Sequence, residues 1–264
     1  MSGFDKDWLT LREPADMAAR ARDLVEELRL HLETIPVAKI LDMGCGTGST
    51  WRTLSARLPQ ETRWLLLDYD PLLLEEAAGR IGANDKVSYL QFDLSHLGRL
   101  PLDGVSLVTA SAFFDLASED FCAGFVERLA SVSGGLYAAL NYDGLVRWSE
   151  WHPLDEAVVA AFNRHQQIDK GLGPALGPVA TACLEAALGQ HGYKVQLMAS
   201  PWRMDASMSE LQQAFLSGFR QPVLEMGDLG EAEVEDWLNW RLAAIHNPDS
   251  LCEVGHTDLL ALPQ

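Results

Sequence analysis

Segment 42–48, Asp-Met-Gly-Cys-Gly-Thr-Gly, places three glycines at alternate positions, after an apolar run and before a helical pattern. This succession predicts a strand at 37–43, a tight turn, and a helix at 49–58. Alternating glycines let the backbone turn sharply and approach a ligand closely, because no Cβ stands in the way. The N–H groups at the start of the helix would face that ligand. The turn therefore predicts a site for a nucleotide-like ligand, with a ligand-free connection as the alternative.

The spacing of the glycines argues against two common phosphate-binding turns. A dinucleotide-binding turn reads Gly-x-Gly-x-x-Gly, whereas Ser49 stands where the third glycine would be. The P-loop of nucleoside triphosphate-binding proteins ends in Gly-Lys-Ser/Thr, and this turn has no lysine. An NAD-dependent oxidoreductase stays as a disfavoured alternative. Asp68, at the end of the strand expected at 63–68, could accept hydrogen bonds from the ribose hydroxyls of NAD, but the same acid would suit the ribose of another nucleoside cofactor.

Apolar runs and helical patterns alternate along the chain. Strands are expected at 37–43, 63–68, 87–92, 104–110, 135–140, 193–198 and 258–262. Helices are expected at 14–32, 49–58, 71–81, 119–130, 154–168, 181–191, 207–218 and 231–245. Continuous apolar strands separated by helices indicate a mostly parallel sheet that is covered on both faces. Such sheets bind ligands beyond the carboxyl ends of their strands, where the strand order switches.

Charge and cysteine content restrict the class of protein. The formal net charge of −18 disfavours binding to nucleic acid or to an anionic membrane, since both demand a basic surface. The four cysteines lie far apart, with no zinc spacing, so neither a metal site nor a disulfide framework is expected. The first residues have neither a basic stretch nor an apolar stretch, so no secretory signal is expected, and no run of about 18 apolar residues occurs. A cytoplasmic protein is the resulting expectation.

The strand, the acid at its end, the Gly-x-Gly-x-Gly turn and the following helix resemble the first motif of class I S-adenosylmethionine-dependent methyltransferases. The resemblance covers about residues 37–140 and extends more weakly to the C-terminus. It implies a Rossmann-like, seven-stranded, mostly parallel sheet with an antiparallel last strand, helices on both faces, and helical lid insertions. The implied parts are an N-terminal cap helix (1–36), a cofactor-binding core (37–140), lid insertions (141–180 and 200–250), and segments completing the sheet (181–199 and 251–264).

The same resemblance implies S-adenosyl-L-methionine as the cofactor and assigns residues to it. The turn would wrap the methionine part, Asp68 would bind the ribose, and Asp93 would accept the adenine amino group. The alternative for Asp93 is a helix cap on the turn 95–98. The implied cofactor-binding residues are Asp42, Gly44, Cys45, Gly46, Gly48, Asp68, Tyr69, Asp93, Leu94 and Ser111.

The segment after the fourth strand should pass the reacting methyl group. It lacks the Asn-Pro-Pro-Tyr element of amino-group methyltransferases, which argues against a nucleobase or amide nitrogen as acceptor. Its polar and aromatic candidates are Ser111, Phe113, Phe114 and Asp115. Asp115 would bind a substrate cation or hydroxyl, or else cap the next helix. Arg12 and Glu13, just before the first expected helix, are further candidates at the mouth of the cofactor site, with plain surface charges as the alternative.

A catalytic pair is expected in the first lid insertion. His165 and Asp169 lie four residues apart in the expected helix 154–168, so they would share one face. The acid would orient the imidazole, which would serve as a general base. An exposed ion pair is the alternative. Tyr142 and His152 are the other candidate catalytic residues, and Arg203 is a candidate for holding a substrate carboxylate.

These features together predict a methyltransferase that acts on a small molecule by in-line transfer to oxygen or nitrogen. The expected form is a monomer or homodimer that needs no metal. The alternatives are a regulatory S-adenosylmethionine-binding protein, or pseudo-enzyme, without turnover and, less favoured, the oxidoreductase. The sequence does not specify the acceptor.

Overall fold

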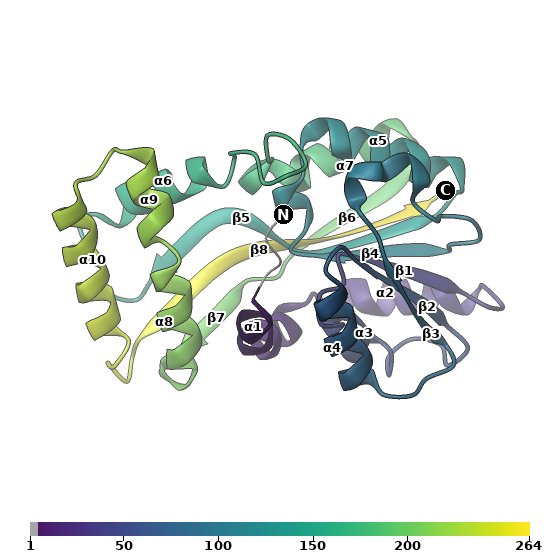
Figure 1. Cartoon of the computed structure of the whole chain (residues 1–264), viewed down its shortest axis with the longest axis horizontal. Helices are drawn as coiled ribbons and strands as arrows, with labels where there is room; N and C mark the ends of the chain where they lie inside the picture. The colour runs from purple at the N-terminus through teal and green to yellow at the C-terminus, as the bar shows by residue number, and fades with distance from the viewer. Residues whose placement is uncertain (1–4) are drawn as a thin grey trace.

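A mixed eight-stranded sheet forms the centre of the computed structural model, which describes residues 5–264 (Figure 1). Its order is β3-β2-β1-β4-β5-β8-β6, and β7 pairs with β8. The strands are β1 (Lys39–Met43), β2 (Arg63–Asp68), β3 (Val87–Gln91), β4 (Leu107–Ser111), β5 (Gly135–Trp148), β6 (Tyr193–Ala199), β7 (Trp202–Asp205) and β8 (Leu251–Pro263). Strands β1–β5 pair in parallel, and β8 is antiparallel to β5, β6 and β7. The predicted Rossmann-like sheet is confirmed, with β7 as an additional short strand.

Helices cover both faces of the parallel part of the sheet. They are α1 (Lys6–Ala19), α2 (Arg22–Glu33), α3 (Ser49–Leu54), α4 (Pro71–Ile81), α5 (Glu119–Ser131), α6 (Asp155–His165), α7 (Ala180–Gln190), α8 (Ser209–Ser217), α9 (Arg220–Met226) and α10 (Glu231–Ala244). Short 3₁₀ turns are η1 (Leu94–Arg99), η2 (Phe114–Leu116), η3 (Gly177–Val179) and η4 (Ala206–Met208). Helices α5 and α7 lie on one face, and α2, α3 and α4 on the other (Figure 1). Within residues 5–264, no helix is long and apolar enough to cross a bilayer.

The N-terminal region corrects one prediction. The single helix expected at 14–32 is two helices, which separate at Arg20 and Ala21. Helix α1 starts earlier than expected, because the Asp5 side chain caps it, and Pro14 lies inside it rather than at its start. At the break, the backbone N–H of Ala21 donates to the buried carboxylate of Asp258 on β8 (2.9 Å). A residue far away in the sequence thus accepts a hydrogen bond from the backbone N–H at the start of α2. The helical pattern of residues 14–32 does not reveal this contact or the break.

Strands β5 and β8 are much longer than predicted and carry a second layer of helices. The sequence after Leu140 looks like a turn, yet β5 continues to Trp148 through two register irregularities against β8. The extended ends of β5 and β8, together with β7, pack on α6, α8, α9 and α10 around a separate buried cluster (Figure 1). The central side chains of this cluster are Tyr142, Trp202, Phe219 and Trp237. These four helices therefore pack directly on the extended part of the sheet.

Candidate functional site

The glycine turn after β1 has the conformation that its spacing predicts. The φ angles are +66° at Gly44, +53° at Gly46 and +82° at Gly48, all in the left-handed region. A Cβ on Gly46 would lie 3.2 Å from the Leu9 side chain of α1, and one on Gly44 would lie 3.1 Å from the ring of Phe113. Larger residues at these positions would be strained and crowded. The absence of side chains thus lets the backbone of the turn lie close against α1 and the segment after β4.

Asp42, at the end of β1, is fully buried beneath this turn. Its Oδ1 accepts a hydrogen bond from the hydroxyl of Thr109 on β4 (2.6 Å). Its Oδ2 has no hydrogen-bond partner in the described part of the chain. Burial raises the pKa of Asp42 to about 7, because the charged form loses its hydration. A buried carboxylate oxygen without a partner is rare and indicates a place for a ligand or water.

Asp68, at the end of β2, joins the turn to the neighbouring strand. Its Oδ2 accepts from the N–H of Gly46 (2.8 Å), and its Oδ1 accepts from the N–H of Asp70 (3.0 Å). Burial raises the pKa of the carboxyl, while these backbone donors lower it. Each oxygen retains a second lone pair, so Asp68 can hold the turn and still accept hydroxyl groups from a ligand.

The predicted adenine-side residues lie at the ends of β2 and β3. Asp93 caps η1 by accepting the N–H of Ser95 (2.9 Å), which is the capping geometry given above as the alternative. The Ser95 hydrogen bonds lower its pKa. Leu94 is buried in the main core, whereas Tyr69 is about half exposed. Asp93 and Tyr69 thus keep polar atoms and a ring available at this edge.

Sequence reasoning missed Arg20. This residue lies at the break between α1 and α2 and is buried, with 5% of its surface exposed. Its Nη2 donates to the hydroxyl of Ser111 at the end of β4 (2.8 Å), which in turn contacts Thr50 Oγ1 (3.2 Å). Its Nε and Nη1 have no hydrogen-bond partner among residues 5–264. The sequence analysis predicted one uninterrupted helix over 14–32 and assigned no role to Arg20, whose position at the break appears only in the structure.

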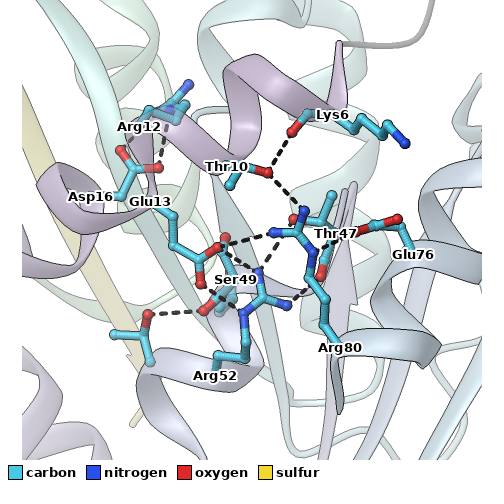
Figure 2. A network of polar contacts seen from close by, with 12 residues as sticks. Lys6, Thr10, Arg12, Glu13, Asp16, Thr47, Ser49, Arg52, Glu76 and Arg80 are labelled. Atoms are coloured by element: carbon cyan, nitrogen blue, oxygen red, sulfur yellow. Dashed lines mark hydrogen bonds and ion pairs between the residues drawn. The ribbon is translucent and has the colours of Figure 1, made fainter. Parts of the chain in front are cut away.

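Helix α1 closes over the glycine turn through ion pairs. Glu13 of α1 accepts two hydrogen bonds from Arg52 of α3 (2.7 and 2.6 Å) and lies 3.7 Å from Arg80 of α4. Figure 2 shows both guanidinium groups converging on Glu13, while Arg52 also binds the carbonyl oxygen of Thr47 in the turn. Arg80 adds a hydrogen bond to Thr10 of α1 (2.7 Å). These contacts fix α1 against α3 and α4.

A neighbouring face of α1 lines a cavity of about 310 Å³, which lies at the carboxyl end of β4 and beside the middle of β5. Its walls are mostly aromatic and apolar, with a few polar side chains. The lining residues are Trp8, Arg12, Ala112, Asp115, Leu116, Leu140, Tyr142, Phe162, Gln166, Trp202, Ala214, Phe215, Gly218, Val254 and His256. Ala112 and Leu140 have left-handed φ angles of +49° and +57°. Such strain in non-glycine residues is typical of functional sites.

Among the predicted catalytic residues, Tyr142 lines this cavity. Its hydroxyl donates to Asn163 Oδ1 on α6 (2.7 Å). Burial raises the pKa of Tyr142 well above its usual value, so the phenol stays protonated. Its ring therefore forms a wall, while its hydroxyl serves as a link to α6.

The predicted contact between His165 and Asp169 on one face of a helix is wrong. Helix α6 ends at His165, and Asp169 lies in the following loop, where it accepts the N–H of Gly171 (2.7 Å). His165 Nε2 instead pairs with Glu225 of α9 (2.8 Å). Neither His165 nor Asp169 is among the residues that line the cavity. The helix was expected to continue to residue 168, whereas α6 ends at His165, so Asp169 is not on the same helix face.

The two remaining candidates also lie outside the cavity lining. His152 accepts a hydrogen bond from the N–H of Leu154 (3.2 Å), and its ring lies beside Trp240. Arg203 forms an ion pair with Glu253 (3.0 Å), and its side chain is 70% exposed. No group of three or more potential metal-ligating side chains occurs within residues 5–264.

Comparison with known proteins places the glycine turn within a family model. Residues 40–133 match the model described as a methyltransferase domain. A comparison with curated protein sequences found no significant match. The chain is similar in fold to an S-adenosylmethionine-dependent methyltransferase from Geobacter sulfurreducens, solved with S-adenosyl-L-homocysteine: 18% identity, all of both chains covered, TM-score 0.50. It is also similar to a cyclopropane-fatty-acyl-phospholipid synthase-like protein from Lactobacillus casei: 15% identity, 95% of this chain and 99% of that chain covered, TM-score 0.52.

Proposed function

We propose that this chain is an S-adenosylmethionine-dependent methyltransferase and that it methylates a small molecule held in the cavity beneath α1. Residues 40–133 match a methyltransferase domain, and the cavity lies beside the glycine turn of that segment. The observation that carries this proposal is the adjacency of two sites. Ser111 belongs to the polar cluster beside the glycine turn, and the next residue, Ala112, lines the aromatic cavity. A donor on the turn and an acceptor in the cavity would therefore meet at the end of β4.

The residues of the turn and the neighbouring strand ends fit S-adenosylmethionine. In the proposal, the turn from Gly44 to Gly48 contacts the methionine part, and the partnerless nitrogens of Arg20 bind its carboxylate. Asp68 accepts the ribose hydroxyls, and Asp93 accepts from the adenine amino group. When bound, the cofactor supplies an electrophilic methyl group on a sulfonium. The task of the chain is then to align the acceptor and exclude water, and alignment alone supplies up to about 7–11 kcal/mol in favourable cases.

Isothermal titration of the full chain with S-adenosylmethionine, S-adenosylhomocysteine and NAD tests the proposal. We expect both sulfur compounds to bind and NAD to leave no signal, since the turn lacks the dinucleotide spacing. Release of S-adenosylhomocysteine across a panel of small acceptors then measures turnover. Binding of NAD alone would favour an oxidoreductase, and binding without turnover would favour a regulatory protein.

Replacing Glu13 by glutamine should make S-adenosylhomocysteine dissociate faster, by about 5–10-fold. The variant removes the anion that Arg52 and Arg80 share, and a hydrogen bond to a charged group contributes about 1.5–3 kcal/mol, part of which holds α1 closed. Stopped-flow displacement measures the rate. Glu26→Gln is the matched control, because it breaks an exposed ion pair with Arg29 on α2. Equal rates in both variants would mean that α1 does not cover the bound cofactor.

A further inference from the structure

We propose that the acceptor is an amine that enters the cavity as its ammonium ion, with Asp115 as the residue that binds the ion and takes its proton. This inference rests on the proposed methyl transfer and narrows it to one class of acceptor. It depends on four features of the cavity: the free oxygen of Asp115, the aromatic walls, the pairing of Arg12, and the neutral state of His256.

Asp115 presents a buried oxygen without a partner. The residue lies in η2, directly after β4, and lines the cavity. Its Oδ1 is inaccessible to solvent and makes no hydrogen bond to any part of the chain that the structure describes. Ser118 Oγ, rather than Asp115, caps α5 through the N–H of Phe121 (3.2 Å), so the capping alternative for Asp115 is wrong. Leaving a buried carboxylate oxygen unpaired is costly, and a cationic ligand held by the carboxylate would reduce that cost.

The walls of the cavity suit a cation on an apolar body. Trp8, Tyr142, Phe162, Trp202 and Phe215 all line it. Aromatic faces attract ammonium groups through the ring quadrupole, and the attraction is strongest where water is excluded. They also remove the apolar part of a ligand from water, which favours binding. An ammonium group on an aromatic or aliphatic body matches both properties.

The cation of the cavity, Arg12, is already neutralised. Its Nε and Nη2 bind the two carboxylate oxygens of Asp16 (2.9 and 3.1 Å), and its guanidinium lies 4.8 Å from the ring centre of Trp202. Trp202 Nε1 donates to the same Asp16 carboxylate (2.9 Å). An anionic acceptor would find Arg12 committed and would lie near Asp115. The balance of charge therefore favours a cation.

His256 of β8 contributes no charge to the cavity. Burial, and then the positive charge of Arg12, lower its pKa to about 3, so the imidazole is neutral at physiological pH. Its Nδ1 has no hydrogen-bond partner within residues 5–264. A neutral ring nitrogen gives the bound amine a second polar contact without repelling it.

The transfer balances with Asp115 as proton acceptor. Burial raises the pKa of Asp115 to about 6, while a hydrogen bond to its own backbone and the charge of Arg12 on α1 oppose this rise, so the free carboxyl is mostly ionised at neutral pH. Tyr142 from β5, Gln166 from the loop after α6, and His256 complete its polar surroundings and are neutral. One ammonium proton moves to Asp115, and the freed lone pair forms the N–CH₃ bond while the donor's S–CH₃ bond breaks. The product is an N-methylammonium ion, the donor leaves as a neutral thioether, and Asp115 returns its proton to solvent.

Three probes of similar shape test the charge preference in protein saturated with S-adenosylhomocysteine. These are 2-phenylethylamine, 2-phenylethanol and 3-phenylpropanoate. We expect calorimetry to give at least tenfold tighter binding of the amine than of the alcohol, no binding of the acid, and methylation of the amine with S-adenosylmethionine. Equal or tighter binding of the alcohol or the acid, or no binding of the amine, would overturn the inference. Failure to bind S-adenosylhomocysteine at all would instead overturn the proposed function.

Asp115→Asn tests the role of the carboxylate, because it retains the shape and removes the charge. We expect unchanged affinity for S-adenosylhomocysteine, loss of the amine preference, and at least 100-fold lower kcat/KM. In the native chain kcat/KM should rise with pH through about 6, as Asp115 ionises, and this limb should be absent from the variant. Asp120→Asn, an exposed charge change on α5, is the control and should retain both properties. A native-like preference and pH limb in Asp115→Asn would exclude Asp115 from this role.

Discussion

Asp68→Ala is expected to weaken the binding of S-adenosylhomocysteine by about 100-fold. The variant removes the acceptor proposed for the ribose hydroxyls and the partner of the Gly46 N–H in the turn. Hydrogen bonds to a charged group contribute about 1.5–3 kcal/mol each, so a net loss of about 3 kcal/mol, or 100-fold in Kd, is a conservative expectation. Isothermal titration measures the loss directly and does not depend on knowing the acceptor.

Asp70→Ala, two residues further on, is the matched control. Asp70 caps α4 by accepting the N–H of Leu72 (2.9 Å), so its loss should cost about 1 kcal/mol of stability and leave cofactor affinity within about twofold. The comparison separates binding from general damage at the end of β2. A similar affinity in the two variants would show that Asp68 only supports the turn, and the proposed ribose contact would then be wrong.

The parallel half of the fold was predictable because its signals are local. Each strand from β1 to β4 is a short apolar run followed by a turn or a helix start, and a sheet covered on both faces demands that pattern. Asp42, the glycine turn and Asp68 are close in sequence to the strand ends that position them. The family match at residues 40–133 covers the same region and confirms the prediction of a methyltransferase domain.

The cavity and the strands around it were not predictable from the sequence, because contacts between residues far apart in the chain build them. The left-handed Leu140 is held by Asp258, whose carboxylate accepts its N–H (2.8 Å) across 118 residues. The same carboxylate accepts the N–H of Ala21 at the break before α2. One buried acid on β8 thus fixes an irregularity in β5 and a helix boundary, and neither leaves a local pattern. His256, two residues before Asp258, lies opposite Tyr142 where β8 pairs with β5, and both side chains line the cavity.

In helix α1, too, the sequence does not reveal which side chains contact which site. Trp8 and Arg12 line the cavity, whereas Leu9 and Glu13 lie against the turn and its flanking helices. Each pair is spaced four residues apart, so two neighbouring faces of one helix contact the two sites. The sequence analysis gave Arg12 and Glu13 as candidates at the mouth of one site, with surface charges as the alternative. It did not reveal that they belong to different sites.

Arg241→Ala should lower the stability of the chain by about 3–5 kcal/mol, which is on the order of 10 °C in Tm. The Arg241 side chain on α10 is 1% exposed and pairs with Asp155 at the start of α6, partly through Nε (3.0 Å). Its Nη1 also donates to the carbonyl oxygen of Glu150 (2.8 Å), and its guanidinium lies 4.2 Å from the ring centre of Trp148. Truncation leaves Asp155 without its counter-charge and leaves a cavity beside the tryptophan. Thermal or urea unfolding measures the loss.

Arg220→Ala provides the control, because it removes a partly exposed arginine that pairs with Glu231 and Glu235 on α10 and should cost less than about 1 kcal/mol. The double variant Asp155→Asn/Arg241→Ala should recover part of the stability lost in Arg241→Ala, since no charge is then buried alone and the amide oxygen can still accept a hydrogen bond from Trp237 Nε1 or the N–H of His152. Recovery would assign the loss to the unpaired Asp155 charge. A double variant no more stable than Arg241→Ala would assign it to the packing of Arg241 against the tryptophans. Affinity for S-adenosylhomocysteine should stay unchanged in the folded protein in either case, because the glycine turn lies outside the buried cluster that joins α6 to α10.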